Sequence, residues 1–185
     1  PEFGGNDVID LTGFEGADVI LGGSGNDEIY GGNAVEGDVM IGDNGVVAGG
    51  TPVIQPDLGQ ADVNDIYTTD GLYGGNDKIY GSAGADIIMG GSGNDIIFGN
   101  AGDDILLGDG GYVDRNAGGT ITQIRTHEAQ YGGNDYIDFM SLDGPLVNAA
   151  GALGNDLIFG GSGDDTIDAG LEAIAHRIFG DNGYV

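Results

Sequence analysis

The chain has 185 residues, 41 of them glycine, and its 31 acidic side chains against 4 Lys and Arg give a net charge of −27. Such a charge repels other polyanions, which makes nucleic acid a poor partner. The sequence has no apolar run long enough to span a membrane, and the lack of cysteine excludes disulfides and thiolate metal sites. This composition is typical of disorder, yet 39% of the residues are hydrophobic and they recur at a fixed spacing.

A nine-residue unit repeats along the chain, which is typical of stacked-repeat folds. It is clearest at 22–30, 90–98 and 160–168, where a Gly-Gly-Ser-Gly turn precedes Asp at position six and Ile at position eight. Looser copies occupy 13–21, 81–89, 99–107 and 151–159, and half-units begin at Gly4, Gly74 and Gly132. The sixth positions are Asp7, Asp18, Asp27, Asp38, Asp77, Asp86, Asp95, Asp104, Asp135, Asp156 and Asp165. The eighth positions are Ile9, Ile20, Ile29, Met40, Ile79, Ile88, Ile97, Leu106, Ile137, Ile158 and Ile167.

A longer period groups these units into blocks. Similar Gly-Asp-x-Gly segments beginning at Gly42, Gly108 and Gly180 each close a block. The predicted division is block one at 4–47, an insert at 48–72, block two at 73–113, an insert at 114–130, and block three at 131–185, itself interrupted at 140–150. The β-branched segment 120–126 in the second insert predicts a strand. Because a block holds too few units to be stable alone, we expect the blocks to stack in one solenoid, as a slice of a longer array.

The physics of the unit predicts its architecture and a metal. Six glycine-rich residues favour a turn, and three residues around a central aliphatic favour a short strand whose middle side chain points inward. Stacked units would place Asp77 above Asp95 and Asp86 above Asp104, at the strand spacing of about 4.8 Å. Ionised carboxylates at that spacing repel unless a cation lies between them. Carboxylate and carbonyl oxygens favour calcium over zinc, copper or magnesium.

The unit Gly-Gly-x-Gly-x-Asp-x-aliphatic-x resembles the calcium-binding nonapeptide of the RTX (repeats-in-toxin, hemolysin-type) family. The resemblance covers most of the three blocks and none of the inserts. It implies an all-β fold, a right-handed parallel β-roll with two units per coil and several calcium ions held between the turns of successive coils. It also implies which residues bind. One turn gives the carbonyls of positions two and four and its Asp, and the turn two units later gives those of positions one and three and its own Asp.

Carried onto this chain, the resemblance implies three complete sites. The first uses Phe3, Gly5 and Asp7 with Gly22, Ser24 and Asp27. The second uses Tyr73, Gly75 and Asp77 with Gly90, Ser92 and Asp95, and the third uses Ser82, Gly84 and Asp86 with Gly99, Ala101 and Asp104. Further ligands implied in the same way are Asp18, Asp38, Tyr131, Gly133, Asp135, Asp156, Gly160, Ser162 and Asp165.

Some residues depart from the pattern. The spacing from Asp7 to Asp18 is eleven instead of nine, as it is from Asp27 to Asp38, which requires a bulged turn. His176 stands where the last unit should carry Asp, so Asp156 is expected to lack a partner. Position two of the block ends is Asp43, Asp109 and Asp181, for which the pattern gives no role.

The outer face of block two is unusually apolar. Ile87, Met89, Ile105 and Leu107 stand at positions seven and nine, which point away from the internal column. A patch of this size usually marks an interface. Two covers are compatible with the sequence: the inserts, with the aliphatics of 51–54 and 121–124, or a second copy of the chain.

The sequence contains no recognisable arrangement of catalytic residues. His127 is not followed by the second histidine of a zinc-protease helix, the serines lie inside the turns, and the carboxylates are accounted for by metal. We therefore expect no enzyme but a calcium-binding β-roll segment of a large secreted or surface protein that folds on binding calcium outside the cell. The resemblance adds export by type I secretion machinery. Two alternatives stay open: a structural or adhesive array, and an accessory module of a secreted enzyme.

Overall fold

The structure of the protein is a computed structural model that describes residues 4–33, 35–48, 53–54, 61–62, 65–116, 118–127, 130–138, 154–168, 176–181 and 185. Phe3, expected as a calcium ligand, lies outside these residues. Within them the secondary structure is β-strand except for one 3-10 turn, η1, at Gly71–Tyr73. The expected all-β class is confirmed.

The repeat units form two parallel sheets. The first roll sheet has the order β1-β3-β9-β11-β15-β17. Its strands are β1 Val8–Asp10, β3 Glu28–Tyr30, β9 Lys78–Tyr80, β11 Ile96–Phe98, β15 Tyr136–Asp138 and β17 Thr166–Asp168. The second roll sheet has the order β2-β4-β10-β12-β16-β18. Its strands are β2 Val19–Leu21, β4 Val39–Ile41, β10 Ile87–Gly91, β12 Ile105–Asp109, β16 Leu157–Gly161 and β18 Arg177–Asp181.

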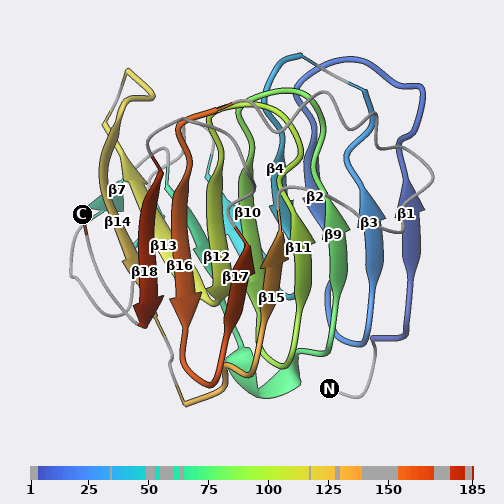
Figure 1. Cartoon of the computed structure of the whole chain (residues 1–185), viewed down its shortest axis with the longest axis vertical. Helices are drawn as coiled ribbons and strands as arrows, with labels where there is room; N and C mark the ends of the chain where they lie inside the picture. The colour runs from blue at the N-terminus through green and yellow to red at the C-terminus, as the bar shows by residue number, and fades with distance from the viewer. Residues whose placement is uncertain are drawn as a thin grey trace.

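The chain alternates between the two sheets, so one strand from each makes a coil. Figure 1 shows the coils following one another from the blue N-terminal strands to the red C-terminal ones. Strands separated by an insert pair in the same way as consecutive ones: β9 pairs with β3 across the first insert, with Ile79 beside Ile29, and β15 pairs with β11 across the second. Together the sheets form a parallel β-roll.

The core between the two sheets is a column of aliphatic side chains, one from each three-residue strand centre. It contains nine buried residues: Ile20, Ile29, Met40, Ile79, Ile88, Ile97, Leu106, Ile137 and Ile158. Ile9 and Ile167, in the terminal strands of the first sheet, pack against it and are partly buried. All eleven are eighth-position residues, so the period of the sequence predicted this core. A strand centre points inward because side chains alternate along a strand.

A third, antiparallel sheet is built from the block ends and the inserts. Its order is β14-β13-β8-β5. The strands are β5 Gly45–Val47, β8 Ile66–Thr68, β13 Gly111–Arg115 and β14 Ile121–Thr126, and a separate pair joins β6 Val53–Ile54 to β7 Ala61–Asp62. The strand predicted at 120–126 is confirmed by β14.

The antiparallel sheet covers the apolar outer face of the second roll sheet. A second core forms there from Ile41, Ile66, Met89, Leu107, Val113, Ile124 and Phe159, with Ile87 and Ile105 packed at its margin. Of the two covers considered for this face, the structure has the chain's own strands. The expected contribution of Ile124 is confirmed, whereas Ile121 is 36% exposed and the side chains of 51–54 lie outside the described residues.

The outer face of the first roll sheet carries aromatic rings. Tyr30 stacks on Tyr80 with ring centres 4.7 Å apart, and Tyr80 stacks on Phe98 at 5.0 Å. Tyr136 meets Phe98 edge-on at 6.4 Å. All four rings occupy positions seven or nine in adjacent strands, where cross-strand aromatic pairs stabilise a sheet.

Candidate metal sites in the turns

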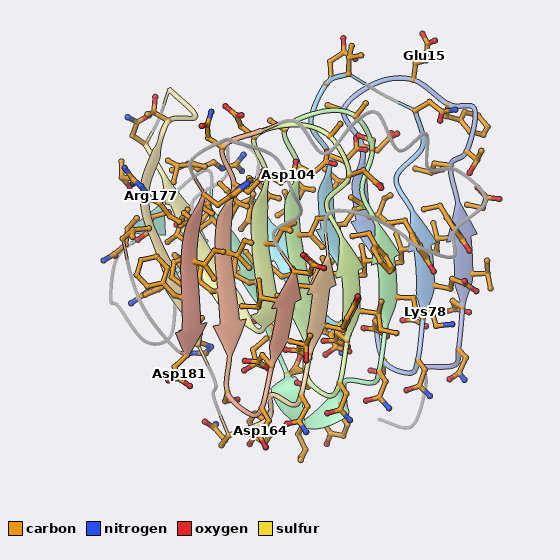
Figure 2. All side chains as sticks on the ribbon, in the orientation of Figure 1. Glu15, Lys78, Asp104, Asp164, Arg177 and Asp181 are labelled. Carbon is orange, nitrogen blue, oxygen red and sulfur yellow. The ribbon has the colours of Figure 1, made fainter. Side chains whose placement is uncertain are left out.

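The sixth-position aspartates line the two turn edges of the roll and most are buried. Figure 2 shows these edges at opposite ends of the strands, with Asp104 at one edge and Asp164, beside Asp165, at the other. The buried members are Asp27, Asp38, Asp77, Asp86, Asp95, Asp104, Asp135 and Asp156. Asp7 is exposed, and Asp18 and Asp165 are half-buried. Only the outermost coils therefore leave these carboxylates open to water.

Each buried aspartate is held by the coil before it. The Oδ1 atom of Asp95 accepts the backbone N–H of Asp77 at 2.8 Å, and Oδ1 of Asp104 accepts that of Asp86 at 2.9 Å. The same bond links Asp7 to Asp27, Asp18 to Asp38, Asp27 to Asp77, Asp38 to Asp86, Asp95 to Asp135, Asp104 to Asp156 and Asp135 to Asp165. The expected stacking of Asp77 with Asp95 and of Asp86 with Asp104 is confirmed.

In seven of the nine aspartates that accept these bonds, the second carboxylate oxygen has no hydrogen-bond partner. Seven Oδ2 atoms are buried and unpartnered: those of Asp27, Asp38, Asp77, Asp95, Asp104, Asp135 and Asp165. Buried polar atoms in folded proteins are nearly always paired, so seven orphaned anionic oxygens in register indicate missing partners. An oxygen-binding cation fits this donor set, because it satisfies the oxygen and its charge together.

Burial also makes these carboxyls hard to ionise. Desolvation raises the pKa of Asp77 to about 7 and that of Asp104 and of Asp135 to about 8, and neighbouring aspartates raise each further. Burial raises the pKa of Asp95 well above its ordinary value for the same reasons. In the folded chain, the negative charge of these buried carboxylates must therefore be neutralised by a proton or by a cation.

Glycine at position one keeps the space beside each orphaned oxygen open. A methyl group on Gly90 would collide with the carbonyl oxygen of Gly108 and with Oδ2 of Asp95. The space that this methyl group would fill is lined by a carboxylate and a backbone carbonyl, which are the ligands that calcium prefers. Among the described residues, no three Asp, Glu or His side chains form a metal-binding group.

Two expected ligands have another partner. Oδ2 of Asp86 accepts the backbone N–H of Ser82 at 2.8 Å. Oδ2 of Asp156 lies 2.9 Å from Nδ1 of His176. No aspartate of the next unit meets Asp156, as the sequence predicts, because His176 stands in its place and brings a ring nitrogen to the carboxylate instead.

The turns that an insert interrupts differ from the ligand sets that the family resemblance implies. In unbroken turns the position-one glycine lies against Oδ2 of the aspartate five residues later, as Gly90 does against Asp95. In the interrupted turns Gly42 takes that place against Asp77, and Gly108 against Asp135.

Asp43 and Asp109 therefore stand at position two, which corrects the expectation of Tyr73 and Tyr131 there. Tyr73 ends η1 and is 43% exposed. The sequence did contain the signal, because Gly-Asp before each insert and Gly-Gly-Asn-Asp after it add up to one six-residue turn.

The other residues that the resemblance implies as ligands lie where the repeat predicts, within turns stacked on one another. They are Gly5, Gly22, Ser24, Gly75, Gly84, Gly90, Ser92, Gly99, Ala101, Gly133, Gly160 and Ser162. Their assignment as calcium ligands stays a prediction.

The class of protein is a calcium-binding repeat roll, and comparison with known families agrees. The model of the RTX calcium-binding nonapeptide repeat matches four times, at residues 12–34, 73–96, 80–112 and 148–173. The chain therefore contains calcium-binding repeats of the RTX type. Searches of curated proteins and of solved structures found no match. In the part of the chain that the structure describes, no helix is long and apolar enough to cross a membrane.

Proposed function

We propose that the chain is a folding module of a protein that works outside the cell, and that calcium drives its folding there. RTX repeats bind calcium and are not themselves catalytic. The observation that carries the proposal is the row of seven buried Oδ2 atoms without a partner. The fold buries these oxygens but gives them no hydrogen-bond partner.

Electrostatics disfavours the metal-free fold at neutral pH. Folding gathers a chain of net charge −27 into a compact body, and it stacks aspartates in register on both edges. Each buried carboxylate must leave water, which opposes its ionisation. The unfolded chain avoids both costs and is rich in glycine, whose backbone loses the most conformational freedom on folding.

Calcium bound between the turns supplies the missing positive charge and binds only the folded arrangement, so it stabilises the fold by mass action. Extracellular calcium modules bind at about 10⁻⁴–10⁻³ M. Such sites stay empty in a low-calcium cytosol and fill outside. We propose accordingly that the chain is exported unfolded and folds after export. The family resemblance points to type I secretion machinery as the exporter.

The apolar faces support a module that folds as one unit. The second core joins residues of both inserts to three blocks of repeats, with Val113 and Phe159 buried in one cluster. This face therefore needs no second copy of the chain as a cover. We propose that the blocks and the inserts form one solenoid with a side sheet.

Far-UV circular dichroism tests the proposal directly. In EDTA at pH 7.5 the chain should give a spectrum of a disordered protein, and added calcium should give β-structure in a cooperative transition. Magnesium at the same concentration should not, because it demands a strict octahedral shell and keeps its waters. A β-type spectrum in EDTA that calcium leaves unchanged would contradict the proposal.

A further inference from the structure

Both inserts leave and re-enter the roll at the same point of a turn. The chain departs after Gly42-Asp43 and returns at Gly74-Gly75, and it departs after Gly108-Asp109 and returns at Gly132-Gly133. Each interrupted turn is thus one six-residue turn made of two segments, with the peptide bond between positions two and three missing.

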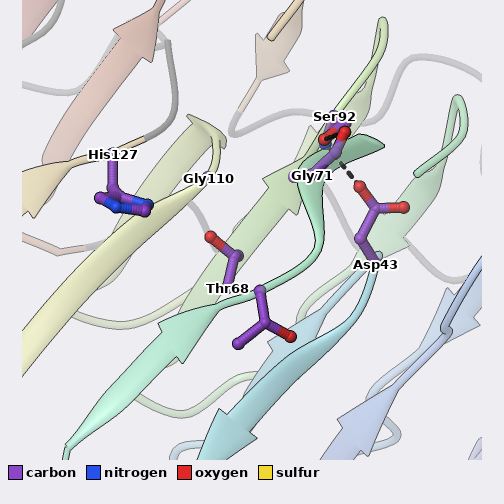
Figure 3. Close-up of a pocket in the computed structure, with 8 residues that line it drawn as sticks. Asp43, Thr68, Gly71, Ser92, Gly110 and His127 are labelled. Carbon is purple, nitrogen blue, oxygen red and sulfur yellow. Dashed lines mark hydrogen bonds between the residues drawn. The ribbon is translucent and has the colours of Figure 1, made fainter. Parts of the chain in front are cut away.

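The aspartate at the break replaces that missing connection. Oδ1 of Asp43 accepts the backbone N–H of Gly75, in the returning segment of its own turn, at 3.0 Å. Oδ2 accepts the backbone N–H of Ser92, in the next coil, at 2.5 Å. Figure 3 shows Asp43 pointing toward Ser92 beside a small cavity that Thr68, Gly110 and others line.

The second break repeats this arrangement. Oδ1 of Asp109 accepts the N–H of Gly133 at 3.0 Å, and its Oδ2 accepts the N–H of Ser162 at 2.5 Å. The hydroxyl of Ser162 also donates to the same Oδ2 at 2.7 Å. The two breaks, at different places in the chain, have the same two backbone hydrogen bonds each, so the arrangement is a feature of the break and not of one insert.

These two aspartates differ from the sixth-position aspartates in what they leave free. Asp43 and Asp109 are 2% and 0% exposed, and both oxygens of each are bonded to amides. In the same turns Asp77 and Asp135 keep an unpartnered buried Oδ2. One carboxylate of each interrupted turn is thus used to hold the backbone, and the other is left for a cation.

The neighbouring coils are adapted to this carboxylate. Position two of the unbroken turns stacked on the breaks is Gly91 and Gly161, with φ of +115° and +116°. A methyl group at either would collide with Oδ2 of Asp43 or of Asp109, respectively. Glycine is therefore required there both for its backbone conformation and for the space that the aspartate fills.

We propose that Asp43 and Asp109 are clasp residues that assemble two composite calcium sites, each from segments that an insert separates in the sequence. The proposal rests on calcium binding by the turns. Each clasp holds the returning segment in register, so that the carbonyls of both segments and the free Oδ2 of Asp77 or Asp135 face one site. Because β5 begins two residues after Asp43 and β13 two residues after Asp109, each clasp also fixes the start of a strand in the covering sheet. Calcium at these turns therefore favours docking of the antiparallel sheet.

The test compares Asp43→Asn with Asp70→Asn in the full chain. Asparagine keeps one acceptor oxygen but turns an amide toward the other N–H, so the clasp is broken. Asp70 is exposed and lies in the insert that follows Asp43, at φ +56°, which asparagine also adopts, so it is the matched control. Calcium stoichiometry comes from isothermal titration, and hydrogen exchange in saturating calcium reports on β5 and β8.

Asp43→Asn should bind at least one calcium fewer than the wild type, with faster exchange in β5 and β8 and unchanged exchange in β15 and β17. Asp70→Asn should match the wild type in both measurements. A wild-type titration and exchange pattern for Asp43→Asn would overturn the clasp. A wild type that binds no calcium would instead refute the proposed function.

A deletion provides a rescue that a general loss of stability does not predict. Removing residues 44–73 together with Asp43→Gly joins Gly42 through a glycine to Gly74-Gly75-Asn76-Asp77. This gives an unbroken turn with glycine at position two, as at Gly91 and Gly161, while the β13–β14 hairpin remains. In this variant the peptide bond replaces the clasp, so its calcium count should match that of the wild type although Asp43 is absent. The clasp is refuted if this variant binds as few ions as Asp43→Asn binds in the full chain. The same comparison decides the question if Asp43→Asn fails to fold in the full chain.

Discussion

Asp104→Asn should stabilise the protein without calcium and destabilise it with calcium. Burial raises the pKa of Asp104 from 3.8 to about 8, so in the metal-free fold this carboxyl carries a proton at pH 7 that it loses on unfolding. Holding that proton at pH 7 costs about 4 kcal/mol at 1.36 kcal/mol per pK unit. This cost approaches the lower end of the stability of a small domain, which is about 5–15 kcal/mol. Asparagine cannot ionise, and its Oδ1 can still accept the N–H of Asp86 that Asp104 accepts now.

The opposite effect is expected with calcium, because the variant loses an anionic ligand oxygen that has no other partner. Sucrose favours compact states and allows metal-free folding to be followed in EDTA. Far-UV circular dichroism should show that Asp104→Asn folds at lower sucrose than the wild type in EDTA, and that it needs more free calcium for half-folding without sucrose.

Asp103→Asn is the matched control. Asp103 is the adjacent residue, is exposed, and accepts the N–H of Asn155, which asparagine also allows. It should follow the wild type in both titrations. If Asp104→Asn shifts both titrations in the same direction, the reasoning fails, since a change of general stability cannot reverse its sign with calcium.

Three further predictions follow from the same structure. In EDTA, β-structure should increase as pH falls from 8 to 5, because carboxyls with a raised pKa, such as Asp77 at about 7, bind more protons folded than unfolded; their contribution is fully present below pH 3.8 and is lost as pH rises through 7. Circular dichroism at each pH checks this, and 1 M KCl at pH 8 should not substitute for acid, because salt screens surface repulsion but not desolvation. Asp95→Ala removes the oxygen above Asp77 and should lower the calcium count in equilibrium dialysis; an unchanged count would refute its role as a ligand. Leu107→Ala should cost the calcium-bound form about 3 kcal/mol in urea unfolding, because the side chain is fully buried under the antiparallel sheet, whereas Ile121→Ala, partly exposed on that sheet, should cost less than about 1 kcal/mol; equal effects would mean that the sheet does not cover Leu107.

The roll was predictable from the sequence because its information is local and repeated. An aliphatic residue every nine positions defines one inward side chain per strand, and Ile29, Ile79 and Ile97 stack in that order. The aspartate ladder has the same period, so its register follows from the register of the strands. Nothing in either prediction required knowledge of a contact outside the repeat.

The antiparallel sheet was predictable only in part, because its pairing is not local. The sequence indicated a strand at 120–126 and an apolar face that needed a cover. The pairing of Tyr112 with Tyr67 joins two strands from different parts of the chain that have no common period. Asp43 was likewise found in the pattern but not understood, since its partners are backbone amides, which no side-chain pattern reveals.

The interrupted turns have a consequence for how such proteins acquire new segments. Ladder neighbours are 18 residues apart within a block, as in Asp77 and Asp95, but 50 apart across the first insert, as in Asp27 and Asp77. The entropy of closing a loop grows only with the logarithm of its length, so this difference costs about 1 kcal/mol. A calcium-binding turn of the roll can therefore accept an inserted segment at a small cost in stability, provided that an aspartate precedes the insert.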